Sequence, residues 1–198
     1  GSLGIGTNAT TTVLSGVVDN ADLAFDLSFD TNIPNYITGN GAVTQLGTAV
    51  LSLNTSNTYS GATIMAAGTI QTSSIANSYI PSSLGAAGSF AADLIFQGGT
   101  LQFIGPATST DRLFSLTGNS LSANIALQPN GPGGTLDSSG SGTLNFTNTG
   151  NLGVQGTGNA TLTLTGNGSG IIASSFVDAS GGATSLVKTG TGNWTLQD

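Results

Sequence analysis

Residues 57–71, NTYSGATIMAAGTIQ, contain the unit that decides the fold. This unit is the sequence GTIQ at 68–71, in which glycine and threonine precede an apolar and then a polar residue. It recurs as GTLQ at 99–102, GTLD at 134–137 and GTLN at 142–145. Alternation of apolar and polar residues is typical of a strand with one buried face, and glycine is typical of the turn before it. The recurrence therefore predicts many short strands separated by turns.

The same alternation continues outside these copies. Residues 23–29 place Leu or Phe at every second position, and residues 161–165 alternate Thr with Leu. Turn signals rich in Gly and Asn follow such runs, for example at 39–41 and 166–168. Because no stretch shows apolar residues at helical spacing, the sequence predicts an all-β protein.

The spacing of the repeated unit indicates the architecture. Ile70 follows Leu51 by 19 residues, whereas Leu101 follows Ile70 by 31 and Leu136 follows Leu101 by 35. We interpret the short step as one coil and the long steps as two coils of a β-solenoid, which gives about ten coils of roughly 20 residues. The prediction is a single-stranded parallel β-helix. An all-β sandwich is the alternative, since it also has short strands and turn signals.

The composition excludes several classes of function. Only 6% of the 198 residues are charged, and nine Asp against Arg112 and Lys188 give a formal net charge of −7. Binding of duplex nucleic acid is excluded because neutralising phosphates requires clustered Lys and Arg. The chain has no His and no Cys, which removes imidazole and thiol catalysis and disulfides. We expect no cofactor and no metal, and no insertion into a membrane by this chain.

Residues 45–71 resemble the passenger-associated transport repeat, also called the autotransporter-associated β-strand repeat, of bacterial autotransporter passengers. The NTYSG core at 57–61, followed by an alternating strand and the GTIQ unit, carries the resemblance. Residues 185–196, SLVKTGTGNWTL, are similar to the start of a second copy. The positions that match the repeat are Asn57, Thr58, Tyr59, Ser60, Gly61 and Gly68 in the first copy, and Lys188, Gly190 and Gly192 in the second.

The resemblance implies a right-handed parallel β-helix that a Gram-negative bacterium secretes, so that it is extracellular or lies at the cell surface. Residues 1–38 are expected to form N-terminal β coils that act as a cap or an assembly end. Residues 39–184 are expected to form the β-helix with one full repeat. Residues 185–198 would begin a further repeat and form the other assembly end.

The chain stops inside this second copy, and we expect the open coil to pair with another copy of the chain. Unpaired N–H and C=O groups at a sheet edge are a template for a neighbouring strand, and head-to-tail contacts that do not close produce fibres. The expected partner is therefore the chain itself, in a homopolymer. The expected interface residues are Leu23, Phe25, Leu27 and Phe29 at one end and Trp194, Thr195, Leu196 and Gln197 at the other.

Other candidate sites are less favoured. Four aspartates between residues 19 and 30 suggest a possible calcium site, since calcium takes several oxygen ligands. The alternation instead places Asp26 and Asp30 on the solvent face of a strand. A β-helix enzyme acting on polysaccharides needs carboxylates close together, whereas those of this chain are scattered. Asp111 is expected to form an ion pair with Arg112. A flat threonine surface for ice binding is disfavoured because no regular pair of threonines occurs in every coil.

Aromatic residues raise one further possibility, the stacking of sugars on exposed rings. The candidates are Tyr36, Tyr59, Tyr79 and Trp194. Tyr59 and Trp194 belong to the repeat motif, so we expect them to pack within the protein. The function predicted is that of a non-enzymatic extracellular fibre built by end-to-end stacking. The alternatives are a stalk fragment of an autotransporter adhesin, with a host-cell or glycan ligand, and, less favoured, a polysaccharide-active enzyme.

Overall fold

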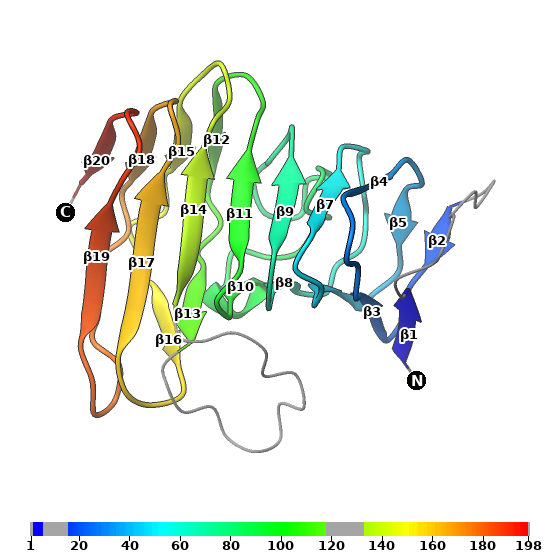
Figure 1. Cartoon of the computed structure of the whole chain (residues 1–198), viewed down its shortest axis with the longest axis horizontal. Coiled ribbons are helices and arrows are strands. Elements are labelled where there is room, and N and C mark those ends of the chain that lie inside the picture. The colour runs from blue at the N-terminus through cyan, green and yellow to red at the C-terminus, as the bar shows by residue number, and fades with distance from the viewer. Residues whose placement is uncertain (1, 6–15, 118–132, 198) are drawn as a thin grey trace.

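A computed structural model describes residues 2–5, 16–117 and 133–197. The strands form parallel sheets in which strands far apart in the sequence lie side by side (Figure 1). Two of the sheets have seven strands. The first contains β1 (Ser2–Ile5), β3 (Asp22–Phe25), β6 (Ala42–Gln45), β8 (Thr63–Met65), β10 (Leu94–Phe96), β13 (Ser115–Thr117) and β16 (Gly153–Gln155). The second contains β4 (Thr31–Ile33), β7 (Val50–Leu53), β9 (Thr69–Thr72), β11 (Thr100–Phe103), β14 (Gly134–Ser138), β17 (Ala160–Thr165) and β19 (Thr184–Lys188).

The third side of the molecule is formed by shorter sheets. A four-stranded sheet comprises β12 (Thr108–Thr110), β15 (Leu144–Phe146), β18 (Gly170–Ile172) and β20 (Trp194–Leu196). A two-stranded sheet pairs β2 (Val17–Val18) with β5 (Ile37–Thr38). The chain visits the sides in the same order in each turn, as in β10, β11 and β12, and then starts the next coil. This order, with parallel pairing between coils, confirms the predicted parallel β-helix.

The coils are fewer and less uniform than the spacing predicted. Leu51 pairs with Ile70, Ile70 with Leu101, and Leu101 with Leu136, each in direct register. Steps of 31 and 35 residues are therefore single coils, and their interpretation as two coils was wrong. The extra residues form excursions at the corners, such as residues 73–93 between β9 and β10. With seven strands in each long sheet, the described residues form about seven coils instead of about ten.

Helical structure in the described residues is limited to one 3-10 turn, η1 (Ala91–Asp93). None of the helical structure there is long and apolar enough to cross a bilayer.

The core is a set of ladders that run through the coils. In the second long sheet the inward-facing row is Leu51, Ile70, Leu101, Leu136 and Leu164, and every member is buried. Direct register stacks one apolar side chain of each coil on that of the next. Each fully buried aliphatic side chain contributes about 1.5–3 kcal/mol relative to leaving it exposed. Three copies of the GT-apolar unit, at 68–70, 99–101 and 134–136, place their apolar residue in this ladder, whereas the copy at 142–144 places Leu144 in β15.

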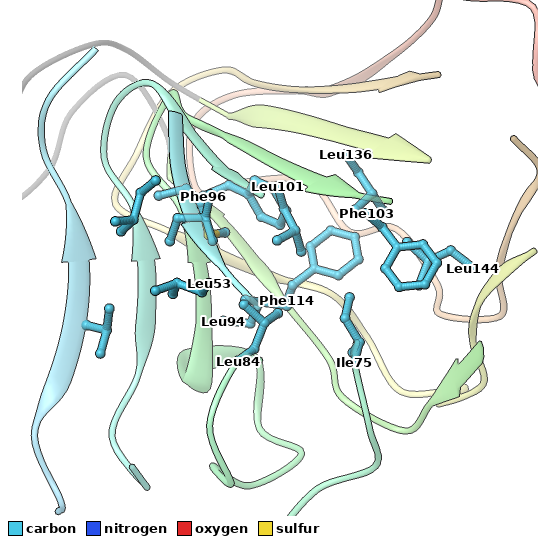
Figure 2. Packing of buried hydrophobic residues seen from close by; sticks show 14 of the residues in the cluster. Leu53, Ile75, Leu84, Leu94, Phe96, Leu101, Phe103, Phe114, Leu136 and Leu144 are labelled. Atoms are coloured by element: carbon cyan, nitrogen blue, oxygen red, sulfur yellow. The ribbon is translucent and has the colours of Figure 1, made fainter. Parts of the chain in front are cut away.

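Aromatic side chains pack among the aliphatic ones inside the central coils (Figure 2). Phe96 and Phe114 lie edge to face with their ring centroids 5.4 Å apart, and Phe114 makes the same contact with Phe146. Phe96 lies in β10 and Phe114 directly precedes β13 of the same sheet, whereas Phe146 lies in β15, and the three rings meet in the interior. Their contact joins the first sheet to the four-stranded sheet across the core.

One corner of the solenoid is built from stacked glycines. A Cβ placed on Gly140 would lie 2.1 Å from the carbonyl oxygen of Gly105 in the preceding coil. A Cβ on Gly168 would lie 2.8 Å from the oxygen of Gly140, and one on Gly192 would lie 1.8 Å from that of Gly168. These distances leave no room for a side chain, so the corner requires glycine in successive coils.

Candidate functional site

The first copy of the repeat motif connects neighbouring coils. Asn57 is buried, its Oδ1 accepts a hydrogen bond from the backbone N–H of Ile37 at 2.8 Å, and its Nδ2 donates to the carbonyl of Ser83 at 2.8 Å. Its own N–H donates to the carbonyl of Ser82 at 2.8 Å. One side chain thereby satisfies backbone groups of the coil before and the coil after it, where the strand pairing is interrupted.

The remaining residues of this copy are structural as well. The amides of Thr58 and Ser60 donate to carbonyls of the preceding coil. A Cβ on Gly61 would lie 2.2 Å from the oxygen of Gly41, and Gly68 has φ +49 with its Cβ position 2.4 Å from the oxygen of Gly47. These positions therefore set the spacing between coils.

Tyr59 lies inside the protein. The side chain is fully buried, and its hydroxyl forms a 2.7 Å hydrogen bond with Thr63 Oγ1. Burial, which disfavours the charged phenolate, raises the pKa of Tyr59 to about 12. Its ring is inaccessible to a ligand, in agreement with the expectation that Tyr59 packs within the protein.

The second copy of the motif forms the last described coil. Lys188 lies in register with Leu164 and donates from Nζ to the carbonyls of Thr189 and Gly190. Gly190 has φ +66, and Gly192 ends the glycine corner described above. Trp194 packs its ring against Gly170 and donates from Nε1 to the carbonyl of Thr165 at 3.0 Å. Trp194 therefore packs on the preceding coil.

The residues expected at the C-terminal assembly end lie at this coil. Thr195 and Leu196 are in register with Ile171 and Ile172 of β18, and the Gln197 amide donates to the carbonyl of Ile172. In the described residues, β19 and β20 each pair with one neighbour, β17 and β18. Leu186 and Leu196 are 42% and 45% exposed, although their register partners, Leu162 and Ile172, are buried.

The residues expected at the N-terminal assembly end are placed differently. Leu23, Phe25 and Leu27 are buried in the core, and β3 pairs with β1 on one edge and with β6 on the other. Their strand is thus inside the sheet, and β1 is the outer strand instead. Phe29 is 45% exposed because β3 ends at Phe25 and the chain turns before β4, which breaks the predicted alternation.

The nearby aspartates have separate partners within the protein. Asp19 accepts from the Ala21 amide, Asp22 from the Thr44 hydroxyl and Asp30 from the Val50 amide. Asp26 is exposed, as the alternation predicted. Among the described residues no three carboxylates converge on a common point that would hold a metal ion.

Residues 73–93 form an excursion that the next coil fastens in place; we call them the pinned loop. The guanidinium of Arg112 is buried and donates to three loop carbonyls, from Nε to Ala76 at 3.2 Å, from Nη1 to Leu84 at 3.0 Å and from Nη2 to Gly85 at 2.9 Å. Burial lowers the pKa of Arg112 from its usual very high value, and the neighbouring Tyr59 opposes this shift. The positive charge is thus used to hold backbone carbonyls.

Asp111 fastens the beginning of the same loop. Its carboxylate accepts from the amide of Ser78 at 2.6 Å and from the Ser78 hydroxyl at 3.0 Å, and its own amide donates to Asn77 Oδ1. The ion pair expected between Asp111 and Arg112 was therefore wrong, because each side chain has its partners in the pinned loop.

The pinned loop exposes a group of large side chains. Tyr79 and Phe90 are each 68% exposed, and Ile80 is 53% exposed. The sequence had suggested Tyr79 as a candidate, whereas nothing in its periodicity pointed to Phe90. Asp93 is one of the carboxylates that lie scattered in the sequence. These residues come together because Gly88 lies between them, close to the hydroxyl of Tyr79, the ring of Phe90 and the carboxylate of Asp93.

The outward face of the second long sheet is polar and regular. Four threonines, Thr69, Thr100, Thr135 and Thr163, lie in register along it. Beside them a chain of side-chain hydrogen bonds runs from Ser52 through Gln71 and Gln102 to Asp137. Because these amides bond to one another along the axis, they stabilise the stack. Threonines do form one regular row, but the second row consists of different residue types.

Comparisons with known proteins give one informative match. No protein-family model matches the chain, and no solved structure matches it. Among curated proteins, the chain is similar to the "Adhesin BmaC autotransporter" of Brucella suis biovar 1 (strain 1330), with 43% identity over 89 residues. The match covers 45% of this chain and 2% of that protein, so the chain spans a very small part of its length. The chain is an autotransporter passenger-like region, which confirms the resemblance predicted from the repeat.

Proposed function

We propose that this chain is a non-enzymatic, rigid segment of the passenger of a surface adhesin, displayed by a Gram-negative bacterium. The observation that carries the proposal is the pairing of seven strands in each of two parallel sheets, without a break in either sheet. The similarity to an autotransporter adhesin supports the location and the role. A solenoid of this kind holds the more distal part of the passenger at a distance from the cell surface.

The contacts along the axis explain how the segment resists bending and proteolysis. Neighbouring coils are joined by strand hydrogen bonds in the two long sheets, by the apolar ladders and by the Gln71–Gln102–Asp137 chain of hydrogen bonds. Backbone groups engaged in such pairing are withheld from proteases, which need an extended, accessible segment. Such a design requires no catalytic group.

The experiment is a replacement of this segment in the full-length gene of the bacterium that encodes it. One strain lacks the segment, and a second carries an unrelated solenoid with the same number of coils. We expect adhesion to a cell layer to fall in the deletion strain and to recover in the replacement strain, because length is what the segment provides. Full adhesion by the deletion strain would contradict the proposal.

Head-to-tail assembly is a second candidate, and the exposure of Leu186 and Leu196 at the free edges of β19 and β20 favours it. A second copy would cover these side chains and pair with both strands. Electron microscopy of the purified chain, over a range of concentrations, tests this. We expect filaments that disappear in the double variant Leu186→Asp and Leu196→Asp, and remain in Ile104→Asp, which changes an exposed residue of a central coil, away from both ends. Single rods at every concentration would contradict assembly.

A further inference from the structure

The pinned loop presents two aromatic rings that the fold does not use. Tyr79 and Phe90 are each 68% exposed, in a protein whose other phenylalanines, except Phe29 and the partly buried Phe176, pack in the core of the described residues. Large apolar side chains grouped on a surface mark sites of interaction more often than single exposed ones do. The pair is therefore a candidate binding surface.

The atoms of this group converge on one point. A Cβ built on Gly88 would lie 2.8 Å from Asp93 Oδ2, 3.2 Å from the Tyr79 hydroxyl oxygen and 3.4 Å from Phe90 Cδ2. The absence of a side chain at residue 88 thus lets a carboxylate, a hydroxyl and an aromatic edge approach one another. An apolar surface next to a few polar groups is the usual composition of a small-molecule site.

The backbone of Tyr79 is held in an unfavourable conformation. Its φ of +64 is the only positive value among the described non-glycine residues, and such a conformation costs about 1–3 kcal/mol. The amide of Tyr79 donates to the carbonyl of Ala87 at 2.9 Å, and Asp111 holds the preceding residue, Ser78. Burial of the ring does not compensate for this cost, since the ring is exposed. The two hydrogen bonds instead hold the backbone in this conformation, and the conformation sets the direction in which the exposed ring points.

The charges around the loop restrict the ligand. Residues 73–93 contain neither Lys nor Arg, and the guanidinium of Arg112 is occupied by three carbonyls. With Asp93 at the site and a formal charge of −7 on the chain, an acidic ligand would be repelled. A sugar ring has an apolar C–H face that packs on an aromatic ring, and hydroxyls that donate to a carboxylate and exchange hydrogen bonds with a phenol.

We propose that Tyr79, Phe90 and Asp93 form a binding site for a neutral carbohydrate. The rings provide the apolar platform, Asp93 accepts hydrogen bonds from the sugar hydroxyls, and the Tyr79 hydroxyl adds a further polar contact. Arg112 and Asp111 are positioning residues, because they hold the loop and do not touch the ligand. This site goes beyond the proposed stalk function and is independent of it, since a solenoid with an inactive loop would still act as a spacer.

The test uses the purified chain, labelled at its amino terminus, on an array of immobilised neutral oligosaccharides and acidic counterparts such as polygalacturonate and heparin. We expect binding to a subset of the neutral glycans, with the affinity reduced at least about tenfold in Tyr79→Ala and in Phe90→Ala. Asp93→Asn, which keeps the shape but removes the charge, should weaken binding as well.

The matched control is Tyr36→Ala, which removes a tyrosine that is 56% exposed outside the pinned loop. This variant should bind as the unaltered chain does. Circular dichroism of all variants verifies that the β-helix is retained. Failure of the folded chain to bind any neutral glycan would overturn the proposal, as would a preference for the acidic ones, or equal binding by Tyr79→Ala, Phe90→Ala and the control. None of these outcomes would affect the adhesion experiment on the spacer.

Discussion

At the scale of the residue, a few buried polar side chains form the hydrogen bonds to backbone groups that strand pairing provides elsewhere. Asn57 and Arg112 both satisfy backbone groups where the third side of the solenoid is irregular. Buried carbonyls without a donor destabilise a protein by about 1–3 kcal/mol each. These side chains are therefore as important to the fold as the apolar ladders.

Replacement of Arg112 by Met removes the donors of three carbonyls while keeping much of the volume. We expect the free energy of unfolding to fall by about 3–5 kcal/mol, as when one partner is removed from a buried charged network. Urea denaturation followed by circular dichroism measures this change. The matched control is Lys188→Met, which removes the other cation at an exposed position and should change the stability by less than about 0.5 kcal/mol. Equal losses for both variants would contradict the role given to Arg112.

Tyr59 makes stability depend on pH in the alkaline range. Its pKa is about 12 in the folded protein, against an ordinary value of 10.0, so the unfolded chain loses its proton first as the pH rises. Stability contributed by the neutral phenol is complete below pH 10 and is lost between about pH 10 and 12, by about 2–3 kcal/mol in total. Urea denaturation at pH 9 and 11.5 tests this, with Tyr59→Phe as the control. A loss of the same size in Tyr59→Phe would show that another group is responsible.

At this scale the sequence predicts the buried ladder residues but not the hydrogen-bond partners of the buried polar side chains. Leu101 and Leu136 follow from the GT-apolar unit, because an inward ladder requires one apolar residue at the same place in each coil. The partners of Arg112 do not, since they are backbone carbonyls 27 to 36 residues earlier, and backbone carbonyls have no sequence signature. The meeting of Phe90 and Asp93 at Gly88 was not predictable for another reason, because this part of the pinned loop has no strand and therefore no alternation to follow.

At the scale of the element, the corners determine how closely two coils approach. Gly105, Gly140, Gly168 and Gly192 stack with no room for a Cβ. The sequence predicted turns at such glycines from conformation alone. The structure adds a second cause, because several of these glycines have ordinary φ values and are required by contact with the neighbouring coil.

Two glycine variants separate these causes. Gly140→Ala introduces a Cβ 2.1 Å from a carbonyl oxygen without a positive φ, whereas Gly181 has φ +72 and nothing within 4 Å of its Cβ position. We expect Gly181→Ala to cost about 1–2 kcal/mol from conformation. Gly140→Ala should cost more, because the coils must move apart against their hydrogen bonds. Thermal unfolding monitored by circular dichroism gives the order, and a smaller effect for Gly140→Ala would refute the contact explanation.

At the scale of the whole molecule, stability is built by contacts between neighbouring coils. Each coil touches the one before and the one after, so a central coil gains two sets of contacts and a terminal one gains fewer. The parallel β-helix and the inward rows were predictable from the repeat. The number of coils was not, because excursions such as residues 73–93 lengthen a coil without adding a strand to its sheets.

Leucines of the second long sheet should therefore matter differently along the axis. Leu101→Ala, in a central coil, is expected to cost about 2–5 kcal/mol. Leu186→Ala, which is 42% exposed in the last described coil, should cost under about 1 kcal/mol. Urea denaturation compares the two, and hydrogen exchange should show the slowest amides in β9, β11 and β14 and faster ones in β20. Uniform exchange along the axis would contradict a stack of neighbour contacts.

The unequal coils have a consequence for how such proteins change over generations. A coil of 19 residues and one of 35 advance the molecule by the same step, the strand separation of about 4.8 Å. Insertions at a corner therefore make the molecule wider at one level and leave its reach unaltered. Reach grows only when an entire coil is duplicated. Selection on the corner loops and selection on the length of the molecule can thus act on different kinds of mutation in a single gene.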